Sequence, residues 1–306
     1  MPTSIAPGSC TSICFSISSS AVGNTAPAAR SFDFAIRRGG LSLDATLIDL
    51  CATVFDWAKF TRAKGAVKLH LLLDHDGYLP QFALITDGRV HEIRFARQLS
   101  FAPGTVLVVD KGFTDYHLFH RWSQAGVFFV TRMRANAVYR VVEERPVPQH
   151  RGILKDQVVY WANPRFHFGS PQHYRRIEVV HPDSGEVWVL LSNHLAWGAT
   201  TLAAIYKDRW QIELFFRALK QNLKIKTFVG TSANALKIQI WTALIAMLLL
   251  RFLQLRARFG WHLSNLIALL RMNLFTHRDL WTWIDQPFQP PPVEVDSVQQ
   301  QTFSFV

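Results

Sequence analysis

The sequence predicts an α/β protein whose core is a mixed sheet with flanking helices. Two observations support this prediction. Residues 41–88 read as three apolar strands, the last two joined by a tight turn, and residues 105–133 read as two continuously apolar strands joined by a helix. The resulting order of strand, hairpin, helix, strand, helix and strand is that of an α/β core with an antiparallel edge.

The first strands are recognised by their apolar pattern and by the turn residues that bound them. The stretch LSLDATLIDL (41–50) is typical of a strand. The stretches AVKLHLLLD (66–74) and YLPQFALITDG (78–88) predict a hairpin, because the DHDG between them consists largely of turn-forming residues. The stretch HEIRFARQL (91–99) then predicts a short helix.

The following segment predicts strands that are buried on both faces. TVLVVDKGF (105–113) is a continuous apolar run that ends in Asp110, and VFFVTRM (127–133) is a second run of the same kind. Between them, residues 115–126 predict a helix that ends at Gly126.

The rest of the chain divides into a β-rich part and a helical part. Residues 137–193 contain alternating strands, among them two around the Asp-Ser-Gly turn at 183–185, and we interpret them as an inserted all-β subdomain. Residues 200–285 predict helices. We therefore expect one domain over residues 41–285.

The two ends of the chain differ in composition from this domain. Residues 1–40 are rich in Ser, Ala and Gly and show no periodicity, which predicts a disordered or non-native leader. Residues 286–306 begin with a proline-rich stretch and predict a flexible tail.

The charge of the chain indicates the class of its partner. The 306 residues carry a formal net charge of +11 and give an isoelectric point of about 9.9, which favours a polyanion. Nucleic acid is the first such partner and a membrane surface the second. The apolar run Ile240–Leu250 is shorter than the roughly 20 residues of a spanning helix, so we interpret it as a buried core helix.

The cysteines exclude two kinds of stabilising site. Cys10, Cys14 and Cys51 provide neither an even set for disulfides nor the paired spacing of a zinc site. A reducing, cytoplasmic environment fits this composition.

One predicted helix concentrates charge on one face. At about 100° per residue, Tyr206, Arg209, Glu213 and Lys220 fall within an arc of roughly 60°, with Arg217 beside them. A ladder of i,i+4 salt bridges is the simplest explanation, and each pair is worth a few tenths of a kcal/mol. However, no acidic residue lies between Glu213 and Asp279, whereas ten lysines and arginines do, and this asymmetry indicates a surface that faces phosphate.

The same stretch carries a resemblance to a known family. YKDRWQIELFFRALK (206–220) fits the pattern Tyr-x2-Arg-x3-Glu-x6-Lys, and the sequence resembles bacterial insertion-sequence transposases of the IS-four family. The blocks LSLDATLIDL, KGAVKLHLLLD, YLPQFALITDG and VLVVDKGFTDY resemble family blocks in the same order. The resemblance implies an RNase H-like catalytic core, a β-strand insertion before the last acid and a Mg²⁺-dependent Asp-Asp-Glu triad.

The triad is assigned from the residue pattern and from the family resemblance together. Asp110 ends an apolar run that has no packing use for a charge, and the resemblance makes Glu213 the third acid. The first acid is sought among four aspartates, of which Asp74 and Asp76 are explained by turn chemistry. The others are Asp44 and Asp49, and DAT at 44–46 resembles the family's Asp-Ser-Thr block, which selects Asp44.

The triad implies a cofactor and a set of contacts. Carboxylates suit Mg²⁺, and in-line attack at phosphorus suits two such ions, with Mn²⁺ as a substitute. We expect Asp44, Asp110 and Glu213 to be both catalytic residues and metal ligands. We expect Tyr206, Arg209, Arg217 and Lys220 to bind DNA phosphates.

The partners follow from this reading. They are double-stranded DNA at the element ends and at the target site, and a second copy of the chain in a homodimer on DNA. No membrane is expected, and the implied location is the bacterial cytoplasm, in association with the nucleoid.

Three functions therefore remain open at this point. The first is a DDE transposase that cuts DNA and transfers the 3′-OH in the recombination of a mobile element. The second is an RNase H-like nuclease that cuts without joining, and the third is an inactive DNA-binding remnant. Relatives usually carry a helical recognition domain ahead of the first acid. Here only 43 residues precede Asp44, so we expect N-terminal truncation and little preference for the element's own ends.

Overall fold

The computed structural model describes residues 32–33, 40–51, 53–58, 61, 64–149, 151–168, 172–222 and 229–288. The strands are β1 (Phe32–Asp33), β2 (Gly40–Cys51), β3 (Lys64–Asp74), β4 (Pro80–Asp87), β5 (Leu99–Ser100), β6 (Val106–Val109), β7 (Phe128–Arg132), β8 (Tyr139–Glu144), β9 (Ile153–Trp161), β10 (Tyr174–Val180) and β11 (Val187–Ser192). The α-helices are α1 (Glu92–Ala96), α2 (Tyr116–Gln124), α3 (Ala199–Asp208), α4 (Trp210–Asn222), α5 (Ala233–Arg256), α6 (Leu263–Met272) and α7 (Leu280–Asp285), and the short 3₁₀ turns are η1 (Asp56–Ala58), η2 (Lys111–Phe113) and η3 (Pro164–Phe166).

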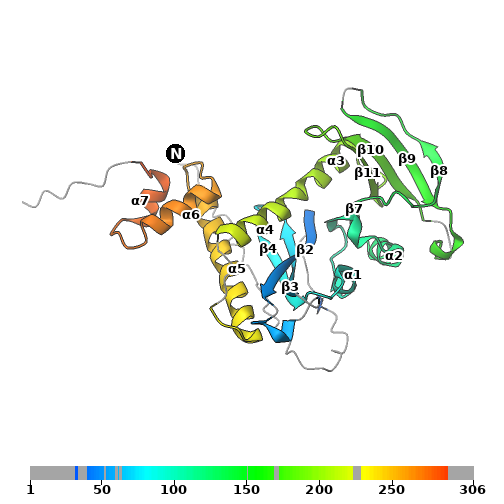
Figure 1. Cartoon of the computed structure of the whole chain (residues 1–306). Coiled ribbons are helices and arrows are strands. Elements are labelled where there is room, and N and C mark those ends of the chain that lie inside the picture. The colour runs from blue at the N-terminus through cyan, green and yellow to red at the C-terminus, as the bar shows by residue number, and fades with distance from the viewer. Residues whose placement is uncertain are drawn as a thin grey trace, which may run out of the picture. The chain divides into compact units, whose positions relative to one another are not determined.

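A mixed sheet forms the core, as the sequence predicts (Figure 1). Its strand order is β4-β3-β2-β6-β7-β11-β10-β9-β8. The strands β4, β3 and β2 run antiparallel to one another, whereas β2, β6 and β7 are parallel neighbours. Parallel neighbours place their carboxyl ends at the same edge of the sheet, and this edge is where the candidate site lies.

Helices cover both faces of this sheet. On one face, Phe95 of α1 and Phe119 of α2 share a buried cluster with Leu43 and Val109. On the other face, Leu202 of α3 is buried with Val108 and other residues of β6 and β7. All four residues of β6 are buried because both faces are covered, which explains the continuous apolar run in the sequence.

The predicted turns are confirmed. The strands β3 and β4 form the hairpin expected around DHDG, where Gly77 has a φ of 83°. The strands β10 and β11 pair around the predicted Asp-Ser-Gly turn, and Gly185 has a φ of 69°. Glycine adopts this left-handed conformation without the steric cost that a Cβ brings.

The structure corrects the expectation of a separate, inserted all-β subdomain. Residues 137–193 form the strands β8 to β11 and are β-rich, as predicted. These strands nevertheless extend the central sheet, because β11 pairs antiparallel with β7 through Leu190 and Arg132. Sequence alternation predicts strands and hairpins, but it does not say which edge of another strand is free to accept them.

The terminal segments are largely outside the described residues. This holds for residues 1–31, 34–39 and 289–306, so the predicted leader and tail stay predictions there. Within the leader, Phe32–Asp33 forms the strand β1, which pairs in parallel with β5. The expectation of no fixed structure before about residue 40 is therefore wrong at these two residues.

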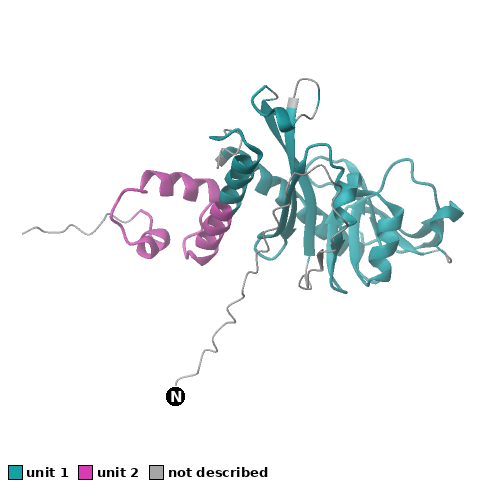
Figure 2. Cartoon of the chain, turned by 90° about the horizontal axis from the view of Figure 1, so that it is seen from below, with its two compact units in different colours: residues 1–244 teal, residues 245–306 magenta. Residues whose placement is uncertain are grey.

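The chain contains two compact units, residues 1–244 and 245–306 (Figure 2). The expected single catalytic domain over 41–285 thus crosses a unit boundary. The second unit has a small core of its own, in which Trp261, Leu266, Trp283 and Ile284 are buried.

The helix α5 is longer and more exposed than predicted. It has 24 residues, and an 18-residue window within it has a mean hydropathy of 1.8; within the described chain it alone is long and apolar enough, by length and composition only, to cross a membrane. Leu244 and Met247 are buried, whereas Ile245 and Leu249 are exposed. The expectation of a buried core helix therefore holds for one side of the helix only.

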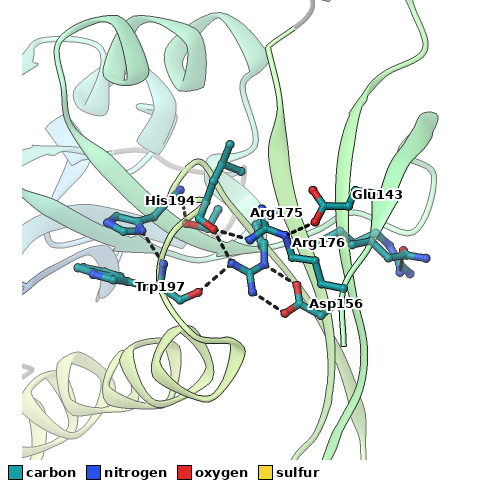
Figure 3. A network of polar contacts seen from close by, with 10 residues as sticks. Glu143, Asp156, Arg175, Arg176, His194 and Trp197 are labelled. Atoms are coloured by element: carbon teal, nitrogen blue, oxygen red, sulfur yellow. Dashed lines mark hydrogen bonds and ion pairs between the residues drawn. The ribbon is translucent and has the colours of Figure 1, made fainter. Parts of the chain in front are cut away.

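A buried ion pair anchors the segment that leads into α3 (Figure 3). Arg175 on β10 forms a two-armed contact with Asp156 on β9, and both side chains are almost fully buried. The same guanidinium donates hydrogen bonds to the carbonyl oxygens of Leu195 and Trp197, at 2.7 and 2.8 Å. The far strands of the sheet thus hold the loop from which α3 and then α4 extend.

A buried histidine predicts acid sensitivity of the fold. His70 on β3 contacts Thr86 at 2.9 Å through Nε2, and its ring lies 4.6 Å from the tilted ring of Phe95. Burial lowers the pKa of its imidazole to about 3. Since the unfolded chain takes up this proton near pH 6.5, folding stability is fully present above that pH and is lost as the pH falls towards 3, by about 1.4 kcal/mol per unit. Urea unfolding at pH 7 to 4 should show a flatter pH profile for His70→Gln. The exposed His117→Gln is the control that should keep the wild-type profile.

Candidate active site

The sheet register brings two of the predicted acids to neighbouring positions. Leu43 of β2 pairs in parallel with Val109 of β6, and each is followed directly by an aspartate, Asp44 and Asp110. Asp110 precedes η2, and its side chain makes no capping hydrogen bond there. Two carboxylates thus lie side by side where β6 ends.

Both aspartates belong to the face of the sheet that α3 and α4 cover. Successive side chains of a strand point to opposite faces. Leu43 and Val109 are packed with α1 and α2, so the residue after each points to the other side. The hydrogen bonds of Asp44 agree with this placement, because its partner Arg209 lies between α3 and α4.

The third predicted acid is joined to this pair through an arginine. Arg209 donates one hydrogen bond to Asp44 Oδ2 at 3.3 Å and another to Glu213 Oε1 at 2.5 Å. The side chains of Arg209, Asp44 and Glu213 are 14%, 19% and 33% exposed. The structure therefore brings Asp44 and Glu213 to opposite sides of one guanidinium.

The environment of Asp44 disfavours its charge. Burial raises the pKa of Asp44 to about 7, and the negative charges of Asp110 and Glu92 act in the same direction. The backbone N–H of Ala45, which donates to Asp44 Oδ1 at 2.7 Å, and the charge of Arg209 lower the pKa. Carboxylates that crowd one another in this way are stabilised when a cation lies between them.

A cleft of about 550 Å³ opens beside Asp44 and Glu213. Its lining residues are Asp44, Ala45, Thr46, Glu213, Phe216, Arg217, Lys220 and Gln221. Lys220 donates a hydrogen bond to Thr46 Oγ1 at 2.6 Å, which joins α4 to β2. Arg217 is exposed, and its guanidinium lies 6.0 Å from the centre of the Trp210 ring. Of the predicted phosphate ligands, Arg217 and Lys220 face this cleft.

Tyr206 does not lie on an open face. It is 3% exposed, packs with α3 residues and β-strand residues in the core, and contacts the ring of Trp188 edge-on at 5.5 Å. Its hydroxyl has no hydrogen-bond partner among the described residues. The expected phosphate contact of Tyr206 therefore disagrees with its burial, and here Tyr206 is a packing residue.

The predicted single helix is also interrupted. The helix α3 ends at Asp208 and α4 begins at Trp210, because the N–H groups of Arg209 and Ile212 bond to carbonyls three residues back instead of four. Helical periodicity placed Arg209 with Glu213 correctly. It did not predict that Arg209 turns inwards at the junction.

The competing first acids have other surroundings. Asp74 accepts hydrogen bonds from the N–H of Asp76 and the side chain of Gln81, and so stabilises the hairpin turn. Asp76 is exposed at the tip, and Asp49 is exposed further along β2. Only Asp44 of the four is within hydrogen-bonding distance of Arg209 in the described chain.

The donor set fits a hard divalent cation, although its three acids are not yet gathered. The side chains are carboxylates, as Mg²⁺ and similar ions prefer. Within the described residues, no three His, Cys, Asp or Glu side chains stand close enough to hold an ion together. Asp44 and Glu213 are instead each paired with Arg209.

Sequence reasoning missed three residues at this edge. Glu92 of α1 influences the charge of Asp44, Thr46 binds Lys220, and Arg132 follows Thr131, which pairs with Val109. Arg132 was detectable in principle, because it ends a buried strand as Asp110 does. Glu92 had no such signal, because it stands at the start of a five-residue helix.

Comparison with known proteins identifies the family. A family described as the transposase DDE domain matches residues 36–249, which is more than half of the chain. The chain belongs to the DDE transposase family. Enzymes of this family cleave DNA and transfer its strands, and they generally use divalent metal ions.

Named relatives agree with this membership. The transposase y4zB of Sinorhizobium fredii is 32% identical over 274 residues, which cover 86% of this chain and 75% of the relative. The transposase for insertion sequence element IS5377 of Geobacillus stearothermophilus is 26% identical, and that for IS4SA of a Synechocystis strain is 25% identical. These matches cover 69% and 71% of this DDE transposase chain, but only 55% and 62% of the two relatives.

Among solved structures, the piggyBac transposase synaptic complex with hairpin DNA aligns with a TM-score of 0.45 at 11% identity. The alignment covers 84% of this chain and 55% of the other. A likeness at this level adds nothing to the architecture described above.

Proposed function

We propose that the chain catalyses metal-dependent cleavage of a DNA strand at the end of an insertion sequence, followed by attack of the freed 3′-OH on target DNA. The observation that carries the proposal is the parallel register that sets Asp44 beside Asp110, with Glu213 on the far side of Arg209. An antiparallel trio of strands followed by parallel neighbours supports an RNase H-like core.

Asp44, Asp110 and Glu213 would hold two Mg²⁺ ions, with Mn²⁺ as a substitute. Bound there, the ions supply Lewis-acid stabilisation of the attacking and leaving oxygens at phosphorus. The protein's part is to fix the two aspartates on adjacent strands and to bring Glu213 to them on α4. In each step one P–O bond forms and one breaks, and the leaving oxygen takes up a proton.

Arg209 has a place in this arrangement that differs from a simple phosphate contact. Its guanidinium neutralises Asp44 and Glu213 in the described structure. With divalent cations held by these carboxylates, the neutralising charge of Arg209 would no longer be needed there, and its planar fork would suit a phosphate of the DNA backbone.

The DNA follows the cleft beside α4. Arg217 and Lys220 line this cleft, and the basic character of the chain supports binding to the ends and target in duplex DNA. Action at two ends suits a homodimer on DNA, in association with the bacterial nucleoid.

Arg217→Ala should weaken DNA binding and reduce its salt dependence. Each lost phosphate contact lowers the slope of log K against log salt by roughly 0.9 on duplex DNA. Fluorescence anisotropy between low and physiological salt measures this slope. Arg89→Ala removes an exposed arginine from the turn after β4. If Arg89→Ala reduced DNA affinity and its salt dependence as much as Arg217→Ala does, the net charge alone would explain the binding.

Joining distinguishes this proposal from its alternatives. In a strand-transfer assay with pre-cut element ends and plasmid target, a transposase produces joined molecules. A nuclease that cuts without joining yields nicks only, and an inactive remnant yields bound but unchanged DNA. We expect joined products that require the divalent cation.

A further inference from the structure

A second carboxylate, apart from the predicted triad, faces the end of β6. Glu92 is the first residue of α1, which packs against η2, the turn that directly follows Asp110. Its side chain is 29% exposed, so it is accessible but not free in solvent. The helix α1 belongs to the face opposite α4, and Glu92 therefore approaches the strand end from the other side.

One oxygen of Glu92 is held in place by a partly buried lysine. Lys68 of β3 donates to Glu92 Oε1 at 3.3 Å and to the carbonyl oxygen of Val90 at 2.9 Å, and its side chain is 12% exposed. Two acceptors fix the ammonium, and the ammonium fixes one side of the carboxylate. This support distinguishes Glu92 from a glutamate at a solvated helix end, whose side chain is free to rotate.

The other oxygen of Glu92 lies beside Gly112, on the side of Asp110. A Cβ at Gly112 would lie 3.6 Å from Glu92 Oε2 and 4.0 Å from Asp110 Oδ2. Two carboxylate oxygens from different elements thus border the space that the missing side chain leaves.

We propose that Glu92 is a positioning residue of the reacting centre, whose carboxylate orients the water ligands of a divalent cation held by Asp110. The proposal rests on the proposed function, because it presupposes that Asp44 and Asp110 bind the ion. Groups that orient metal ligands from outside commonly change metal affinity by 10- to 100-fold when they are replaced.

The test measures Mn²⁺ binding to the full chain without DNA, with the electron paramagnetic resonance signal reporting the concentration of free ion. Glu92→Gln keeps an oxygen for Lys68 but removes the charge, and we expect roughly 10- to 100-fold weaker binding. Gly112→Ala should weaken binding as well, since its methyl group would contact Glu92 Oε2 and Asp110 Oδ2 at ordinary distances and keep water from both. Thermal unfolding of both variants should stay close to that of the wild type.

Lys68→Met separates position from charge. It removes the ion pair that holds Glu92 Oε1 but leaves the carboxylate, so binding should weaken less than in Glu92→Gln. Equal weakening by Lys68→Met and Glu92→Gln would mean that Glu92 acts through the fold alone, and the proposal would be overturned. Wild-type binding by Glu92→Gln, with weak binding by Asp110→Asn, would also overturn it. Wild-type binding by Asp110→Asn would instead overturn the proposed metal site itself.

Discussion

Glu213→Gln should lower Mg²⁺-dependent nicking of element-end DNA by roughly 1000-fold or more, since a lost metal ligand removes several kcal/mol of transition-state stabilisation. The amide keeps the size of the side chain and an oxygen that can still accept from Arg209. DNA binding should be unchanged or slightly tighter, because one negative charge leaves a surface that faces phosphate.

A purely structural Glu213 gives the opposite pattern. Its pair with Arg209 is an i,i+4 contact between partly exposed side chains, which is worth a few tenths of a kcal/mol. In that case Glu213→Gln would lower thermal stability slightly and spare cleavage. The matched control is Glu143→Gln, the same change at an exposed glutamate of β8 that is paired with Arg145, and it should cleave normally.

Asp156→Ala should destabilise the fold by about 3–5 kcal/mol, because it leaves the buried guanidinium of Arg175 without its counter-ion. Both partners are almost fully buried, at 2% and 4% exposed. Arg175 also holds the carbonyls of Leu195 and Trp197 ahead of α3, so the loss should loosen the helices that carry Glu213.

Urea unfolding measures this effect. The control Glu143→Ala breaks an exposed pair and should cost no more than about 1 kcal/mol. The double change Asp156→Leu with Arg175→Met removes both charges and should recover much of the loss. A cost for Asp156→Ala as small as that of the control would mean that the ion pair does not anchor the sheet.

The sequence predicted the parts of the fold that depend on local pattern. Apolar runs, turn glycines and the Asp after β6 were enough to place β2, β3, β4, β6 and β7 and to nominate Asp110, whereas β5 was not predicted. Once β2 and β6 are parallel neighbours, the proximity of Asp44 and Asp110 follows, because each comes directly after a residue of the last pair between these strands, Leu43 and Val109. Helical spacing likewise placed Arg209 beside Glu213.

Contacts between distant segments could not be predicted in this way. The pairing of β7 with β11 joins residues that are far apart in sequence, such as Arg132 and Leu190, which are 58 positions apart. The inward turn of Arg209 depends on tertiary attraction by Asp44, which lies on another element. Tyr206 is a second example. Its spacing in the sequence suggested a charged helix face, but tertiary packing, which includes the contact with Trp188, buries it.

The central claim is that Asp44, Asp110 and Glu213 form one metal-dependent centre that cuts DNA. Its most direct measurement is the rate of Mg²⁺-dependent nicking of duplex DNA that carries the repeats flanking the gene, for the wild type and for Asp44→Asn, Asp110→Asn and Glu213→Gln. We expect the wild type to nick this DNA and all three variants to lose nicking while they remain folded and bound. A wild-type chain that leaves the DNA intact, or any of the three variants nicking at the wild-type rate, would contradict the claim.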